Sequence, residues 1–153
     1  PKHVQQFTEE GHLRWDSLGE FLALAVSLDH LGNTTNNSKA TILGNSLDEA
    51  TDKLLENKKG PSRKVNQLDN RGSHFYIAMY WAEALANSDD ANLKAKFSKI
   101  SEDLMAKEAI ILTELNDAQG AAVNIEGYYE PNERLTTDAM RPSKTLNAII
   151  DSI

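Results

Sequence analysis

The sequence contains no cysteine, and this absence excludes disulfide bonds and metal sites built from thiolates. It is also compatible with a cytoplasmic location, which we expect. No apolar run approaches the roughly 18–20 residues that a membrane-spanning helix needs, because even the richest stretch, residues 75–86, is short and contains Glu83. Positive charge is scarce: the net charge is −7, so we expect neither nucleic acid nor a membrane as a partner.

Patterns that carry enzyme chemistry are missing as well. No Gly-x-Ser-x-Gly elbow is present to support a nucleophilic serine. The four histidines are scattered, and none belongs to a His-x-x-x-His pair, so we expect no metal site within the chain. We also assign no catalytic residue.

The chain opens on Pro1-Lys2-His3-Val4, without an initiator methionine and without the charged and apolar regions of a signal peptide. This opening indicates a piece of a longer polypeptide. The 153 residues fit one domain, and 40% hydrophobic and 25% charged residues are typical of a globular protein. We therefore expect residues 1–153 to form a single helical region.

Hydrophobic spacing predicts a mainly α-helical chain with at most short strands. The predicted helices cover residues 17–32, 38–57, 73–87 and 90–119, with a last helix opening at Pro142 and Ser143. Residues 73–87 have almost no polar face, which identifies their helix as the central one. Residues 123–129 are compatible with a short strand.

Particular residues predict where these helices begin, bend and end. Ser17 and Glu20 have the spacing of a capping box, so the first helix is expected to begin at Ser17. Gly32 is expected to end it, and Gly44 with its polar neighbours predicts a bend in the second helix. Pro61 must break that helix because it lacks a backbone donor, and an ordered loop is expected to follow.

Cationic residues gather in two loops of this acidic chain. Lys2, His3 and Arg14 lie in the opening segment, and Arg63 follows the turn at Pro61 among several lysines. Loops commonly carry binding residues, and the planar fork of arginine is suited to phosphate. A solvated loop of mixed charge is the alternative interpretation.

The run Arg14-Trp15-Asp16-Ser17 stands directly before a predicted helix. It offers an arginine that can bind phosphate, a flat aromatic surface and an oxygen acceptor, all beside a helix N-terminus. This combination favours the binding of a nucleotide. Alternatively, Asp16 or Ser17 only caps the helix while Trp15 packs in the core.

A second mixed run precedes the central helix. Residues 68–75 combine turn formers with charged side chains, so they are a similar candidate for ligand binding. The alternative is that Arg71 simply pairs with Asp69.

Several long strings occur in a specific order along the chain. They cover residues 2–7, 11–25, 61–65, 68–76, 127–129 and 139–143. Together they resemble the end of monomeric-type NADP-dependent isocitrate dehydrogenases, and the similarity extends over essentially the whole chain. In that family the C-terminal segment completes a domain begun by the N-terminal segment. The resemblance therefore implies a helical C-terminal portion of a larger cofactor-binding domain, within an isocitrate/isopropylmalate dehydrogenase-like fold.

The resemblance also implies roles for individual residues. His3, Arg14 and Arg63 are implied to hold the 2′-phosphate of NADP, with Lys2 nearby and Asp16 on the adenosine ribose side. The family oxidises and decarboxylates isocitrate to 2-oxoglutarate with the help of Mg²⁺ or Mn²⁺. Its catalytic and metal-binding residues come from earlier segments, so this chain alone is expected to be inactive.

Two further expectations follow. If neighbouring segments are missing, uncovered apolar surface favours self-association of the isolated chain. The alternative function is a noncatalytic helical interaction module, in which the apolar stripe of residues 90–119 docks onto another helix.

Overall fold

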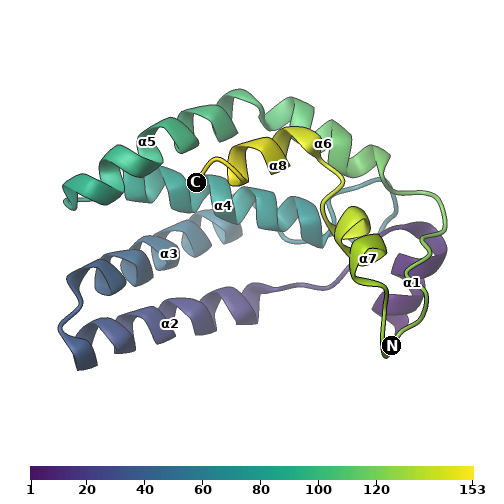
Figure 1. The fold of residues 1–153 in the computed structure, drawn as a ribbon, viewed down its shortest axis with the longest axis horizontal. Coiled ribbons are helices and arrows are strands. Elements are labelled where there is room, and N and C mark those ends of the chain that lie inside the picture. The colour runs from purple at the N-terminus through teal and green to yellow at the C-terminus, as the bar shows by residue number, and fades with distance from the viewer.

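The computed structural model describes residues 1–153, and all of its regular structure is helical (Figure 1). The helices are α1 (Lys2–Glu10), α2 (Leu18–Thr35), α3 (Ser38–Glu56), α4 (Asn70–Ala86), α5 (Ala91–Ala106), α6 (Glu108–Asp117), α7 (Glu133–Met140) and α8 (Lys144–Ile150). Helices α2 to α5 lie side by side in chain order, and α8 lies against α5 and α6. The predicted mainly α fold is confirmed, and residues 123–129 form no strand.

Helix α4 is the centre of the molecule. Most of its side chains are buried, including Phe75 and Tyr76, and they join residues of α2, α3, α5 and α6 in one core cluster. The helix begins at Asn70, earlier than predicted, because the carboxylate of Asp69 accepts hydrogen bonds from the backbone N–H groups of Arg71 and Gly72. The absence of a polar face is thus explained by neighbours on nearly every side.

The predicted capping box at the start of α2 is wrong. Ser17 occupies the N-cap position, but its hydroxyl makes no bond to the helix. Asp16 Oδ1 instead accepts from the backbone of the first helical residue at 3.0 Å, and Glu20 accepts from the indole of Trp15. The Ser17 hydroxyl accepts a hydrogen bond from Asn70 Nδ2 at 2.8 Å. A contact with α4 has therefore replaced the expected local one.

Two glycines let α2 and α3 approach each other closely. Helix α2 continues past Gly32, its predicted end, and α3 runs without interruption through Gly44, where a bend was expected. A Cβ on Gly32 would lie 2.8 Å from the backbone N of Thr41, and one on Gly44 would lie 3.0 Å from the backbone O of Ala25. A larger side chain at either position would therefore prevent the two helices from packing this closely. Helix α2 ends instead at Asn36, which adopts the left-handed conformation.

The single long helix predicted over residues 90–119 is two helices, α5 and α6, separated at Lys107. Its apolar stripe faces the core, since Ile100, Leu104, Ile111 and Leu115 are all buried. Hydrophobic spacing did not predict α1 or α7, which bury one residue and none, respectively. None of the helices combines the length and the apolar character needed to cross a membrane.

Helix α8 is fastened to α6 through the carboxylate of Glu114. This group accepts hydrogen bonds from the hydroxyl of Ser143 and from the backbone N–H and hydroxyl of Thr145. The hydrogen bond from Ser143 has the largest effect, and together they lower the pKa of Glu114 from its ordinary value of 4.5. The deprotonated carboxylate is therefore the form that holds α8 in place.

We expect Glu114→Gln to weaken the acid dependence of stability. Because folding lowers the pKa of Glu114, its contribution is fully present above the unfolded value and is lost as the pH falls through the folded value. Urea unfolding across this acid range measures the effect. Glu130→Gln, at an exposed carboxylate, is the matched control. An unchanged pH profile in the Glu114 variant would contradict this account of the α6–α8 link.

Helix α2 leaves much of its apolar surface uncovered. Leu22, Leu24, Val26 and Leu31 are each at least 45% exposed, and α3 is the main neighbour of this helix. An uncovered apolar patch favours association. We expect the isolated chain to self-associate with rising concentration in sedimentation velocity, and Val26→Lys to reduce that tendency. Ile110→Lys, on α6, is the control, and a parent chain that stays monomeric at every concentration would refute the expectation.

Candidate functional site: a cation pocket

A surface pocket of about 510 Å³ brings together all five residues predicted to bind the cofactor. Its lining consists of Lys2, His3, Arg14, Trp15, Asp16, Pro61 and Arg63, and we call it the cation pocket. The lining comes from α1, from the segment between α1 and α2, and from the loop between α3 and α4. Residues far apart in the sequence therefore face one space.

The cation pocket is positively charged within an acidic chain. The side chains of Lys2, Arg14 and Arg63 form no ion pair, and the five ion pairs of the structure all involve other residues. The one carboxylate of the pocket, that of Asp16, accepts a hydrogen bond from the start of α2 through Oδ1. Unpaired cations around one space are suited to an anion with several charged oxygens.

Two aromatic rings form part of the pocket wall. The ring centroids of His3 and Trp15 lie 5.0 Å apart at an angle of 47°. Trp15 is 46% exposed and its Nε1 donates to Glu20 Oε1 at 2.9 Å, so the alternative in which it packs in the core is wrong. An exposed indole beside cations offers a flat surface to a nucleoside.

The segment that carries Arg14 is fixed to the beginning of α4. The backbone N of Asn70 donates to the O of Leu13 at 2.7 Å, and the Asn70 side-chain amide donates to the O of Trp15 at 2.9 Å. Asp69 Oδ2 accepts from the backbone N of Leu13 at 3.2 Å. Because these bonds flank Arg14 on both sides, the backbone that presents its guanidinium is held in place.

Arg71 binds the protein itself rather than a ligand. Its side chain is 4% exposed and pairs with Asp69, whose side chain is fully buried, at 2.6 Å. Nη2 also donates to the O of Gly11 at 2.6 Å, and Nη1 donates to the O of Ala139 at 2.8 Å. The pairing of Arg71 with Asp69 is thus confirmed, and it joins α7 and the end of α1 to α4.

The loop that carries Arg63 is held from two sides. Gln6 Nε2, on α1, donates to the O of Arg63 at 3.3 Å. From the other side, Gln119 Oε1 accepts from the backbone N of Asn66 at 2.7 Å, and Gln119 Nε2 donates to the O of Gln67 at 2.8 Å. The loop is therefore ordered, as its sequence predicts, and it faces α1. These supporting contacts were not predicted, because nothing in the local sequence marks them.

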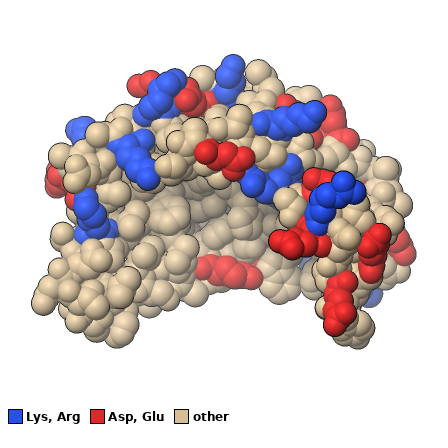
Figure 2. Space-filling view, viewed as in Figure 1, with Lys and Arg blue, Asp and Glu red and all other residues tan.

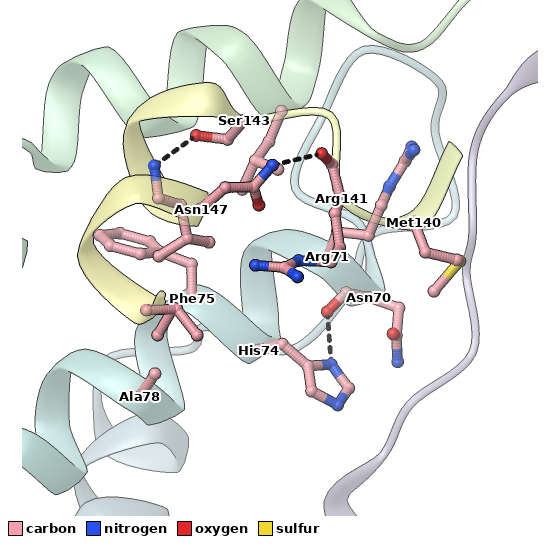
Figure 3. A pocket seen from close by; sticks show the side chains of 12 residues that line it. Asn70, Arg71, His74, Phe75, Ala78, Met140, Arg141, Ser143 and Asn147 are labelled. Atoms are coloured by element: carbon pink, nitrogen blue, oxygen red, sulfur yellow. Dashed lines mark hydrogen bonds between the residues drawn. The ribbon is translucent and has the colours of Figure 1, made fainter. Parts of the chain in front are cut away.

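A second pocket, of about 360 Å³, opens between α4, the end of α7 and α8 (Figure 3). Phe75 and Leu146 contribute to an apolar lining, and both arginines at this pocket already have partners. Arg71 pairs as described, and Arg141 donates to Asp151 at 2.8 Å. A neighbouring groove of about 300 Å³ is lined only by apolar residues. The face of the molecule shown in Figure 2 is hollowed at its centre. Neither space has the unpaired cations that distinguish the cation pocket.

Other chemistry-bearing groups do not line the cation pocket. No group of three or more His, Asp or Glu side chains is placed to hold a metal ion. Burial raises the pKa of Tyr76, reinforced by its hydrogen bond to Glu108, and burial also raises the pKa of Tyr80. Both tyrosines belong to the core cluster, so their shifted pKa values reflect packing.

Comparison with known proteins identifies the family. The family model described as monomeric isocitrate dehydrogenase matches residues 1–151. The chain belongs to the monomeric isocitrate dehydrogenase family. This membership confirms the resemblance seen in the sequence strings.

Curated relatives of this chain are also isocitrate dehydrogenases, and their sequences are highly similar to it. The isocitrate dehydrogenase (NADP) of Azotobacter vinelandii is 59% identical over 98% of this chain, and isocitrate dehydrogenase (NADP) 2 of Colwellia maris is 56% identical over 100%. Isocitrate dehydrogenase (NADP) 2 of Mycobacterium tuberculosis is 52% identical, also over 100%. The matches cover 20% or 21% of these relatives, so the chain spans about a fifth of their length.

Proposed function

We propose that this chain supplies the site for the 2′-phosphate of NADP, as the C-terminal part of an NADP-dependent isocitrate dehydrogenase. The observation that carries the proposal is the cation pocket, where Lys2, His3, Arg14 and Arg63 face one space and the lysine and arginines have no carboxylate partner. Family membership supports NADP as the ligand, because the relatives are named NADP-dependent isocitrate dehydrogenases.

The donor set of the pocket fits a phosphate monoester. Such a group carries nearly two negative charges and three acceptor oxygens at neutral pH. Each arginine can offer paired charged hydrogen bonds, the ammonium of Lys2 adds a further charge, and His3 adds a ring donor. Asp16 is exposed at the same pocket, and its carboxylate can accept a hydrogen bond from the 3′-hydroxyl of the adenosine ribose, which the 2′-phosphate leaves free. NAD carries a hydroxyl in place of this phosphate, so the pocket would favour NADP.

The contribution of this chain to the whole enzyme is cofactor selection. In the intact enzyme, bound NADP would supply the hydride acceptor for oxidation of the secondary alcohol of isocitrate, whose decarboxylation would yield 2-oxoglutarate. We propose that Mg²⁺ or Mn²⁺ and isocitrate are bound by other segments of the intact protein. Because the chain spans about a fifth of its relatives, we expect it to bind the cofactor weakly and to show no turnover.

The proposal is tested by comparing ligands that carry a 2′-phosphate with otherwise identical ligands that lack it. We expect 2′,5′-ADP to bind at least about 10-fold more tightly than 5′-AMP, since one charged hydrogen bond contributes roughly 1.5–3 kcal/mol. NADP should likewise bind more tightly than NAD, and added salt should reduce this difference in affinity. Titration followed by the fluorescence of the exposed Trp15 measures the affinity of all four ligands. Equal affinity for 2′,5′-ADP and 5′-AMP would refute the proposal.

The alternative function, a noncatalytic interaction module, requires the stripe of residues 90–119 as a docking face. The structure buries most of that stripe: Ile100 is 7% exposed, Leu104, Ile111 and Leu115 are at most 2% exposed, and Leu93 and Phe97 are half-buried. A face already used in the core is not available to a partner helix. The cation pocket has no role in that alternative, so the cofactor proposal is favoured.

A further inference from the structure

His12 joins the two segments that present the arginines of the cation pocket. It is fully buried and lies two residues before Arg14. Its Nε2 lies 2.8 Å from the O of Ser62, the residue that precedes Arg63. Its Nδ1 lies 2.6 Å from Oε1 of Gln119, which also holds the loop. One buried ring therefore bridges the Arg14 segment and the Arg63 loop without lining the pocket.

Only one orientation of the Gln119 amide satisfies its neighbours. Its Oε1 accepts from the backbone N of Asn66, and its Nε2 donates to the O of Gln67. Exchanging the two atoms would place an amide NH₂ against the N–H of Asn66 and an oxygen against the carbonyl of Gln67. Both ring nitrogens of His12 consequently face oxygen atoms, and these oxygens can only accept.

We propose that His12 is a positioning residue of the cation pocket, whose buried ring bridges the O of Ser62 and Oε1 of Gln119 and thereby sets the separation of Arg14 and Arg63. This inference rests on the proposed phosphate site. A phosphate presents its oxygens at fixed distances, so two guanidinium groups bind it together only if their backbones are held at a matching separation. Loss of the ring would leave the O of Ser62 without the partner that it has at 2.8 Å, and would release Gln119 from the Arg14 segment.

The environment of His12 supplies no competing partner. The charged groups bonded to the two residues that flank His12 are already engaged, since Arg71 donates to the O of Gly11 and Asp69 accepts from the N of Leu13. The ring bonds of His12 are therefore directed only to Ser62 and Gln119.

Substitution of His12 tests the positioning role through a ratio of affinities. In His12→Phe both polar contacts of the ring are lost, and we expect the preference for 2′,5′-ADP over 5′-AMP to fall about 10-fold while 5′-AMP affinity is unchanged. His12→Gln, whose amide can replace one donor, should recover part of the preference. A purely structural defect would lower both affinities in parallel. An unchanged ratio in a folded His12→Phe chain would overturn the inference.

Thr51→Val is the matched control for loss of a buried hydrogen bond. Thr51 is 1% exposed, donates to the O of Leu47 at 2.8 Å and lies in α3, outside the cation pocket. This variant should lose stability and keep the ratio of affinities.

The positioning role and the phosphate site fail in different ways. A parent chain that does not distinguish 2′,5′-ADP from 5′-AMP refutes the phosphate site itself. A parent chain that makes this distinction, together with a folded His12→Phe chain that keeps the same ratio, overturns only the role of His12.

Discussion

Replacement of Arg71 by methionine is expected to lower the free energy of unfolding by about 3–5 kcal/mol. The substitution leaves the carboxylate of Asp69 fully buried with no opposite charge. It also removes the donors to the backbone oxygens of Gly11 and Ala139. An uncompensated buried charge is costly because the protein interior cannot solvate it as water does. The effect should therefore greatly exceed the loss of an ordinary surface ion pair.

Urea unfolding of the parent and variant chains measures this loss. Arg141→Met is the matched control, because Arg141 pairs with Asp151 where the two side chains are 44% and 65% exposed. Exposed pairs contribute less than about 1 kcal/mol. Adding Asp69→Asn to Arg71→Met removes the orphaned charge and should recover part of the loss. If Arg71→Met costs no more than Arg141→Met, the buried pair does not join the segments as described.

Helices with a continuous apolar face could be predicted from spacing alone. The central position of α4 followed from its lack of a polar face, and the burial of the α5–α6 stripe follows from the same periodicity. The helices that spacing did not predict are α1 and α7, which bury one residue and none. Short helices with so little core contact leave only a weak periodic signal.

Errors in the positions of helix ends share one physical cause. Ser17 was expected to cap its own helix, but Asn70, 53 positions away, donates to its hydroxyl. Gly32 was expected to stop α2, but the close approach of α3 makes a glycine necessary inside the helix. In both places a contact between distant residues overrides a local preference. The sequence around the residue does not reveal such a contact.

The site shows the same division between what was predictable and what was not. Charge placement and the family resemblance named the residues that line the cation pocket, because arginines in loops of an acidic chain are visible in the sequence. The residues that hold those loops were not visible. His12 and Gln119 are 107 positions apart, and each carries an ordinary polar side chain whose partners only the fold reveals.

Substitution of the two arginines should remove the preference for a 2′-phosphate. Arg14→Ala and Arg63→Ala are each expected to weaken binding of 2′,5′-ADP by roughly 1.5–3 kcal/mol, about 10- to 150-fold, because each deletes a charged partner of the phosphate. Binding of 5′-AMP should change little, because that ligand has an uncharged hydroxyl at the 2′ position in place of the phosphate. Titration of both ligands into each variant measures the effect.

Lys64→Ala is the matched control for the arginine variants, since Lys64 is an exposed cation next to Arg63 that does not line the pocket. The double variant then decides whether the two arginines share one phosphoryl group. If they do, their effects are coupled, and the loss in Arg14→Ala/Arg63→Ala differs from the sum of the single losses by more than about 0.5 kcal/mol. Strictly additive losses, or equal losses for 5′-AMP and 2′,5′-ADP, would mean that Arg14 and Arg63 act on the ligand separately or only through the general charge of the surface.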